Sequence, residues 1–208
     1  MSTALGFTRP FTLDRYHAMD RATRQLVALG AIVAPAAHTA TDAMEWLNGG
    51  FTPPQLWLNY AAFLPLPAIM LGLYAVQRPR ISMIGLIGAL LYGFAFVYFT
   101  HTTLTAIAAH VPDYDQLWDQ LGTIYTAHGV VMLIGGGAFG YATIRARVFP
   151  AWCGWLFLTG LTVNLLVGLL PLPDLLQTIG TTVRNGGLIA MGIATWRGSS
   201  LPDPGTAA

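Results

Sequence analysis

Six apolar stretches, separated by prolines and charged residues, limit what this chain can fold into. They cover residues 25–40, 56–76, 81–104, 121–144, 151–170 and 175–196. Five of them are close to the ~20 residues that a helix needs to cross the hydrocarbon core of a bilayer. The first is shorter, but we expect its helix to continue beyond the hydrocarbon through Asp42 and Glu45. The pattern predicts an all-α polytopic membrane protein, a bundle of six transmembrane helices.

The composition indicates the same class of protein. Of the 208 residues, 54% are hydrophobic and 9% are charged, whereas soluble domains carry about 25% charged residues. We therefore expect one transmembrane domain with the lipid bilayer as its solvent. In this interpretation residues 1–22 are a cytoplasmic N-terminal segment, residues 23–197 form the six-helix bundle, and residues 198–208 form a disordered tail.

The charged residues predict the orientation of the bundle. The arginines that this arrangement places on one side are Arg9, Arg15, Arg21, Arg24, Arg78, Arg80, Arg145, Arg147 and Arg197. The opposite loops carry only acidic charges, at Asp42, Glu45, Asp113, Asp115, Asp119 and Asp174. Cytoplasmic loops of membrane proteins are enriched in basic residues. The sequence thus predicts a multi-pass protein of the cell inner membrane with both termini in the cytoplasm.

The residue types exclude several classes of function. All ten basic residues are arginines, which excludes a Schiff-base lysine. Cys153 is the only cysteine, so an internal disulfide and a thiolate-rich metal site are excluded. The net charge of +1 gives no reason to expect a nucleic acid as partner.

Polar residues gather at one depth of the predicted bundle. Counting ~1.5 Å per residue from the nearest cytoplasmic arginine places a polar group from every helix ~20–31 Å above that side. These groups are His38, Asp42, Asn59, Tyr98, His101, His128, Asn164 and Arg184. We expect the prolines at 35, 65 and 67 to kink the first two helices near mid-membrane and widen the space between them.

Three helices carry these polar groups as stripes at helical spacing. The stripes are His38, Asp42 and Glu45 in the first helix, Tyr98, His101, Thr102 and Thr105 in the third, and Gln177, Thr181 and Arg184 in the sixth. Lipid cannot satisfy a polar face, so such a face must meet protein or water. The three stripes together predict a polar cavity that is reached from the outer side of the membrane.

The candidate site residues follow from the chemistry of this layer. The catalytic candidates are Asp42, Glu45 and His128 as acid–base groups and Arg184 as the cation. The candidates for substrate binding are Asn59, Tyr98, Asn164 and Gln177. A metal site would use His38, His101 and His128. Two competing interpretations stay open: Arg184 as a structural residue that ties helix ends together, and the first stripe as a solvated helix end.

Glycines in the fourth helix indicate close packing. Gly136 and Gly140 have the G-x3-G spacing of tightly packed membrane helices. The alternative is a flat cofactor such as haem lying against the helix backbone. The sequence does not choose between a divalent metal, a haem and no cofactor.

Three functions fit these residues. The first is an enzyme that acts on a lipid or isoprenoid substrate through the polar layer in the outer leaflet. The second is a subunit that binds haem, quinone or pigment, with His38 and His128 as axial ligands. The third is a structural or accessory subunit of a membrane complex, or a small transporter. A homo-oligomer and an assembly with partner membrane subunits are both open.

Overall fold

The computed structural model describes residues 19–173 and 175–199, and this part of the chain is helical with connecting turns. Its helices are α1 (Arg21–Asn48), α2 (Pro53–Phe63), α3 (Leu66–Val76), α4 (Met83–Ala109), α5 (Tyr114–Leu121), α6 (Thr123–Ala146), α7 (Ala151–Leu169) and α8 (Leu175–Ser199). The all-α prediction is therefore confirmed. Most of the predicted N-terminal segment and of the C-terminal tail lies outside the described residues.

Helix α1 extends past its apolar stretch, as expected. Asp20 caps its start, because the Asp20 carboxylate accepts a hydrogen bond from the Thr23 backbone N–H at 2.9 Å. The helix continues through Asp42 and Glu45 and ends at Gly49, whose φ of 66° is the left-handed conformation that glycine adopts readily. Pro35 lies inside α1 without interrupting the assigned helix.

The second apolar stretch is divided, as its prolines predict. Helix α2 ends at Phe63 and α3 begins at Leu66, with Pro65 between them. Proline has no N–H to donate and its ring crowds the preceding turn. The two helices together still form one segment, Pro53–Val76, that is long enough for a single crossing.

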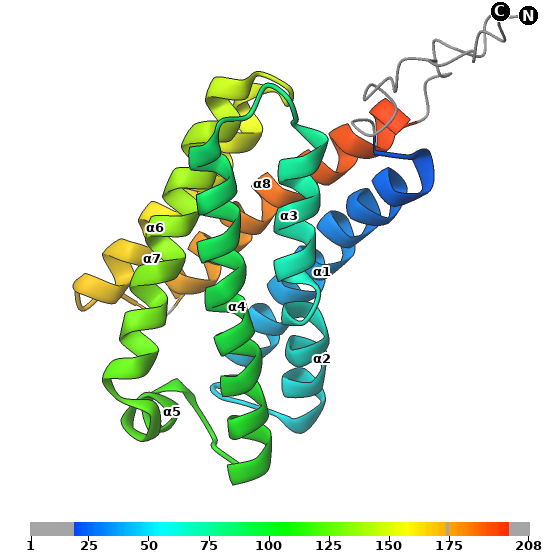
Figure 1. Ribbon diagram of the computed structural model, residues 1–208. Helices are drawn as coiled ribbons and strands as arrows, with labels where there is room; N and C mark the ends of the chain where they lie inside the picture. The colour runs from blue at the N-terminus through cyan, green and yellow to red at the C-terminus, as the bar shows by residue number, and fades with distance from the viewer. Residues whose placement is uncertain (1–18, 174, 200–208) are drawn as a thin grey trace, which may run out of the picture.

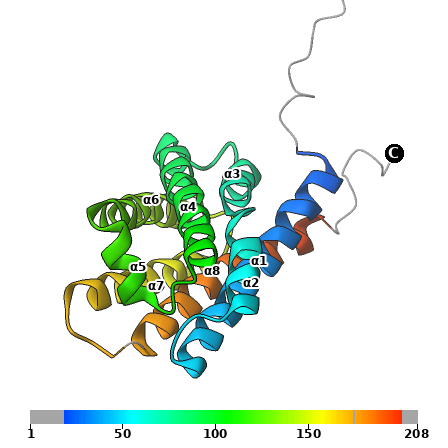
Figure 2. The same cartoon turned by 90° about the horizontal axis from the view of Figure 1, so that it is seen from below.

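The helices form a closed ring in chain order. Each main segment packs against the next, and α8 returns to pack along α1. Figures 1 and 2 show two layers, with α3, α4 and α6 on one side and α1, α8 and α7 on the other, and α2 lies beside α1. Helices α1 and α8 run together at a steep angle to α4 and α6. This ring leaves an interior at the end of the bundle where α5 lies.

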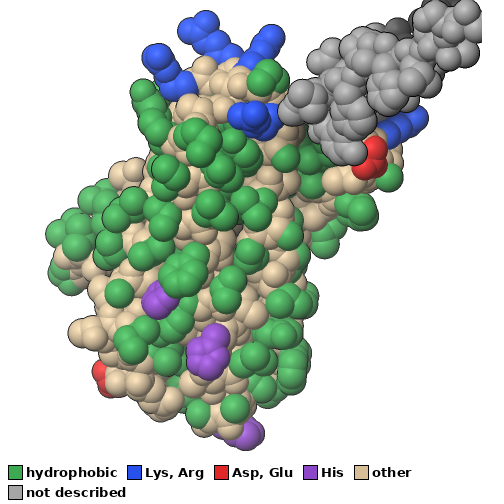
Figure 3. All heavy atoms as spheres, viewed as in Figure 1, with side chains coloured by type: hydrophobic (Ala, Val, Ile, Leu, Met, Phe, Trp, Pro, Cys, Tyr) green, Lys and Arg blue, Asp and Glu red, His purple; other side chains and the backbone are tan. Residues whose placement is uncertain are grey.

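Five segments of the described chain are long and apolar enough to cross a membrane, as in a multi-pass membrane protein. They are α1, the α2–α3 segment, α4, α6 and α7. Large apolar side chains cover the outer surface of these helices (Figure 3), and Leu26, Phe94 and Trp155 are among them. Helix α8 is 25 residues long, but it is not among the five because Arg184, Asn185 and several threonines lower its mean hydropathy.

Glycines set the spacing between neighbouring helices. A methyl group added at Gly135 of α6 would lie 2.5 Å from the backbone nitrogen of Tyr92 in α4. At Gly136 and Gly140 the added methyl would meet Leu161 and Leu158 of α7 at 2.5 and 2.6 Å. The packing role predicted for the G-x3-G pair is confirmed, because both positions lie against a neighbouring helix.

Candidate functional site

A cavity of about 90 Å³ lies within the ring, in the half of the bundle that ends at α5. Helices α1, α2, α4, α5, α6 and α8 and the loop before α2 contribute its walls. The lining residues are His38, Asp42, Phe51, Leu56, Asn59, Phe63, Phe96, Phe99, Thr102, Thr103, Ala106, Tyr114, Leu117, Tyr125, Met132, Gln177, Thr181 and Arg184. Polar groups from α1, α2, α4 and α8 therefore share this space with aromatic and aliphatic side chains.

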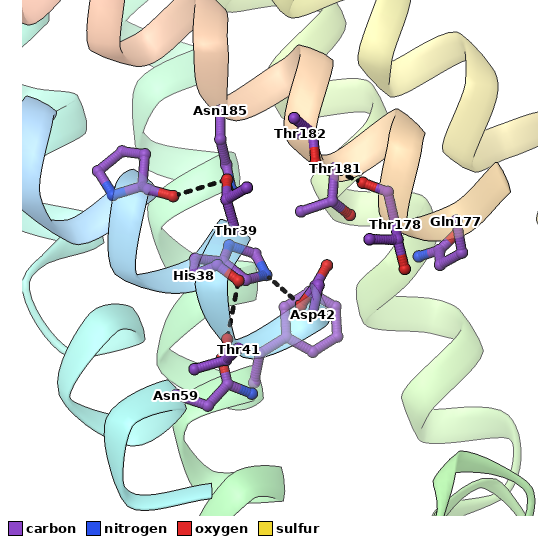
Figure 4. Close-up of polar contacts among 12 residues, drawn as sticks. His38, Thr39, Thr41, Asp42, Asn59, Gln177, Thr178, Thr181, Thr182 and Asn185 are labelled. Carbon is purple, nitrogen blue, oxygen red and sulfur yellow. Dashed lines mark hydrogen bonds and ion pairs between the residues drawn. The ribbon is translucent and has the colours of Figure 1, made fainter. Parts of the chain in front are cut away.

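Helix α1 contributes a histidine–carboxylate pair. His38 and Asp42 are one turn apart, and the His38 Nε2 atom lies 3.5 Å from the Asp42 carboxylate (Figure 4). The His38 ring is buried and packs edge-on against Phe63, with 4.6 Å between ring centroids. Its Nδ1 atom has no hydrogen-bond partner among the described residues. The pair is thus held by apolar packing, and it faces the cavity.

Helix α2 positions one polar side chain opposite this pair. The Thr41 hydroxyl donates to the His38 carbonyl at 2.8 Å and lies 3.2 Å from the Asn59 Oδ1 atom. Asn59 is buried at 4% exposure. Because its Oδ1 atom faces Thr41, its amide nitrogen is left to serve as a donor toward other groups.

Helix α8 presents its polar stripe to the same space. Gln177, Thr181 and Arg184 all line the cavity, as their helical spacing predicts, and Figure 4 shows Gln177 and Thr181 on the side of α8 that faces Asp42. Asn164 of α7 stays behind the wall, where its amide nitrogen donates to the Gln177 carbonyl at 3.3 Å and to the Thr181 hydroxyl at 3.4 Å. Asn164 therefore positions α8 and does not line the cavity.

Arg184 is a buried cation with little protein to neutralise it. The residue is 3% exposed, and one guanidinium nitrogen lies 3.6 Å from the Met132 sulfur, which is a weak acceptor. Its Nε atom has no partner within the described residues. No carboxylate in residues 19–173 or 175–199 lies within ion-pair distance of it, although Asp42 is near enough for their charges to interact.

Asn185 is a buried polar residue that the sequence analysis did not single out. It is 1% exposed, and its amide nitrogen donates to the Thr39 hydroxyl at 3.1 Å. Thr39 in turn donates to the Pro35 carbonyl at 3.0 Å. This chain ties α8 to α1 one residue from Arg184. The signal was present in the sequence, because Asn185 is a second polar residue at the centre of an apolar span.

Helix α4 turns a different face to the cavity than its stripe predicts. Phe99, Thr102, Thr103 and Ala106 line the space. Of the four predicted residues, only Thr102 is among them. His101 is exposed, whereas Tyr98 is half-buried and packs against the core beside α6. The predicted stripe of the third span therefore reaches the cavity only at Thr102.

His128 of α6 also lies outside the cavity. Its ring stacks on Tyr98, with 3.7 Å between centroids, and its Nδ1 atom lies 2.8 Å from the Ile124 carbonyl. The predicted metal ligands His38, His101 and His128 therefore do not converge. The described chain contains no cluster of three or more His, Cys, Asp or Glu side chains with metal-binding geometry. His38 and His128 likewise do not face each other as a pair of axial ligands.

The short helix α5 covers one end of the cavity. The sequence predicted here a loop and the acidic first turn of the fourth span, but residues 114–121 form a separate helix that Asp113 caps. Tyr114 packs against Phe51, with 4.9 Å between ring centroids. Burial raises the pKa of the Tyr114 phenol well above its ordinary value, and the charge of Glu45 raises it further. The phenol thus stays protonated and serves as a donor. Glu45 itself does not line the cavity.

The arrangement combines a buried cation, a histidine–carboxylate pair and an apolar floor. These are the parts that proton transfer beside a developing negative charge requires. No protein-family model, curated protein or solved structure matches this chain.

Proposed function

We propose that this protein is a membrane enzyme that acts on the polar head of a lipid or isoprenoid molecule held in the cavity. The observation that carries the proposal is the buried Arg184, which faces the His38–Asp42 pair across a space without an ion-pair partner in the described residues. A charge near the bilayer centre costs at least ~2.5–3.5 kcal/mol. A residue that is costly to place and has no ion-pair partner among the described residues is explained by a ligand.

Asp42 and His38 supply the acid–base chemistry in this proposal. The Asp42 carboxylate accepts a proton from the substrate and returns it at another atom, as in an isomerisation. His38 holds the carboxylate in position through its Nε2 atom. Arg184 stabilises the negative charge that develops on a substrate oxygen while the proton is away. Asn59 and Gln177 orient the head by hydrogen bonds. This assigns the acid–base role to Asp42 in preference to Glu45 or His128.

The proposed orientation places the cavity in the outer leaflet. Arginine side chains gather at the end of the bundle formed by the α3–α4 and α6–α7 turns (Figure 3). The acidic residues Asp113, Asp115 and Asp119 belong to the α5 end, next to the cavity. The positive-inside rule then assigns the α5 end to the outer side.

The proposal includes α8 as a sixth crossing, which returns the C-terminal end to the cytoplasm. Its 25 residues correspond to a length of ~37 Å, enough to span the hydrocarbon with tilt. It packs along α1 and α7, and Thr181, Arg184 and Asn185 are buried on its inner side. The polar residues that lower the mean hydropathy of α8 thus lie on a face that does not contact lipid.

Single cysteines test this topology. In a Cys153→Ala background, Gln116→Cys at α5 is expected to react with a membrane-impermeant maleimide in intact cells. Ser82→Cys and Gly198→Cys are expected to react only after lysis, since both lie on the arginine-rich side. All three positions are exposed. Labelling of Gly198→Cys in intact cells would show that α8 does not cross.

Deuterium transfer tests the chemistry. The purified protein is incubated in D₂O with the total lipid extract of its host membranes, and the lipids are followed by liquid chromatography and mass spectrometry. We expect one lipid to gain deuterium or to change retention time, because a carboxylate that has exchanged with solvent returns a deuteron. Asp42→Asn should reduce this conversion by ~10²-fold or more.

The matched control is Asp119→Asn, which removes an exposed carboxylate from α5 and should leave the conversion unchanged. If no lipid changes relative to a protein-free sample, the enzymatic proposal is wrong.

A further inference from the structure

We infer that the cavity selects a head group without net charge, one that offers an oxygen acceptor to Arg184 and a hydroxyl donor to Asp42. The inference rests on the proposed function, since it assumes that the cavity is the substrate site, and it names the substrate class. A glycerol monoester has this chemistry, with an ester carbonyl and adjacent hydroxyl groups.

The two charges of the cavity are close but not joined. The Asp42 carboxylate lies 3.5 Å from the His38 Nε2 atom, and the Asp42 side chain lies close to Thr181. Arg184 reaches only the Met132 sulfur. Within the described chain the two form no ion pair, although each lines the same space. A ligand that accepts a hydrogen bond from Arg184 and donates one to Asp42 would satisfy both side chains.

The charge balance argues against an ionic head. Asp42 and Arg184 together contribute a net charge of zero. The other titratable groups that line the space are His38, Tyr114 and Tyr125, and Glu45 lies close to the two tyrosines. An anionic head would pair with Arg184 but would be repelled by the negative charges of Asp42 and Glu45. A cationic head would satisfy Asp42 but meet Arg184. In a buried site an uncompensated charge is strongly unfavourable.

The size and lining of the cavity limit the head to a small group. A volume of about 90 Å³ admits a small polar head but leaves no room for an acyl chain. Phe63, Phe96 and Phe99 line the apolar part of the cavity, where Phe63 and Phe96 pack against the His38 ring. Gln177 is exposed and also lines the cavity, so the space reaches the surface beside α8. We expect the acyl chain to leave there.

Three probes with the same acyl chain length but different heads test the inference. They are glycerol monolaurate, laurate and dodecylammonium, and binding to the protein in lipid nanodiscs is measured by native mass spectrometry at a pH where both ionic probes are charged. The wild-type protein is expected to bind glycerol monolaurate about tenfold more tightly than either ion. Laurate as the preferred probe would overturn the inference, and so would dodecylammonium.

Two charge-removing variants provide the second arm. Asp42→Asn leaves Arg184 alone and should shift the preference to laurate. Arg184→Met leaves Asp42 alone and should shift it to dodecylammonium. Arg197→Met, which removes an exposed arginine at the end of the same helix, should keep the wild-type order. If Arg184 has only a structural role, none of these variants changes the order in which the probes bind. The wild-type order alone decides the inference if a variant does not fold.

The two proposals can fail separately. If the probes bind in the expected order but no lipid is converted in D₂O, the head-group selectivity is supported and the enzymatic function is wrong. If an anionic lipid is converted, the enzymatic function is supported and the proposed selectivity for a neutral head is wrong. Equal binding of all three probes in every variant would show partition into lipid and overturn the inference.

Discussion

Replacing Arg184 with methionine is expected to abolish lipid conversion while the bundle remains folded. The guanidinium is 3% exposed, and within the described residues its hydrogen bonding is limited to the Met132 sulfur. The folded protein therefore loses few contacts when it is removed. It is relieved of one buried charge, while the Asp42 carboxylate loses the cation that offsets its charge. The reaction loses the cation that faces the substrate oxygen. Loss of one such group costs ~10²–10³ in rate.

The measurement pairs the conversion rate in D₂O with thermal denaturation in detergent. We expect the Arg184→Met variant to denature near the wild-type temperature, because these two electrostatic effects oppose each other, and Arg197→Met to match the wild type in both assays. If Arg184 instead ties the helices together, its replacement will lower the denaturation temperature. Full activity in a folded Arg184→Met protein would remove the proposed role of the guanidinium.

Substituting alanine for Gly160 is expected to lower both stability and activity. A methyl group at this position would lie 2.2 Å from the backbone nitrogen of Arg184 and 2.5 Å from the Gly180 carbonyl oxygen. Both atoms belong to the backbone of α8, so the whole helix must move away from α7. Overpacking of this kind costs about 1–3 kcal/mol. A displacement of the catalytic cation by ~1 Å can cost ~10²-fold in rate.

Gly168→Ala is the matched control for this change. Gly168 belongs to the same helix, and nothing lies within 4 Å of a methyl group added there. Its substitution should leave the denaturation temperature and the conversion rate near those of the wild type. Equal effects of the two substitutions would show that the close contact between α7 and α8 does not position Arg184.

The apolar stretches and the prolines were sufficient to predict the long helices. The bounds of α7 differ from the prediction by a single residue, and the division of the second span follows from Pro65 and Pro67. A separate α5 was not predicted, because its acidic residues were assigned to a loop and to the first turn of the next helix. Its amphipathic spacing, with Tyr114, Leu117 and Leu121 on one face, was present in the sequence, and the structure shows that Tyr114 and Leu117 line the cavity.

The stripes of α1 and α8 could be oriented from the sequence because each has one polar face. Their polar residues at helical spacing give the helix a preferred rotation, and His38, Asp42, Gln177, Thr181 and Arg184 meet in one space. Helix α4 has no such preference, since its residues are apolar or small almost all round. The backbones of α4 and α6 approach closely at Gly135, and in this packing His101 faces away from the cavity.

The sequence by itself determined which segments are helical and how far along each helix the polar groups lie. Those quantities follow from hydropathy and from a fixed rise per residue. Only the tertiary structure decided which of these groups face one another. Direction around a helix axis depends on contacts with neighbouring helices, and these contacts brought Arg184 to the His38–Asp42 pair and left His128 on the outer surface.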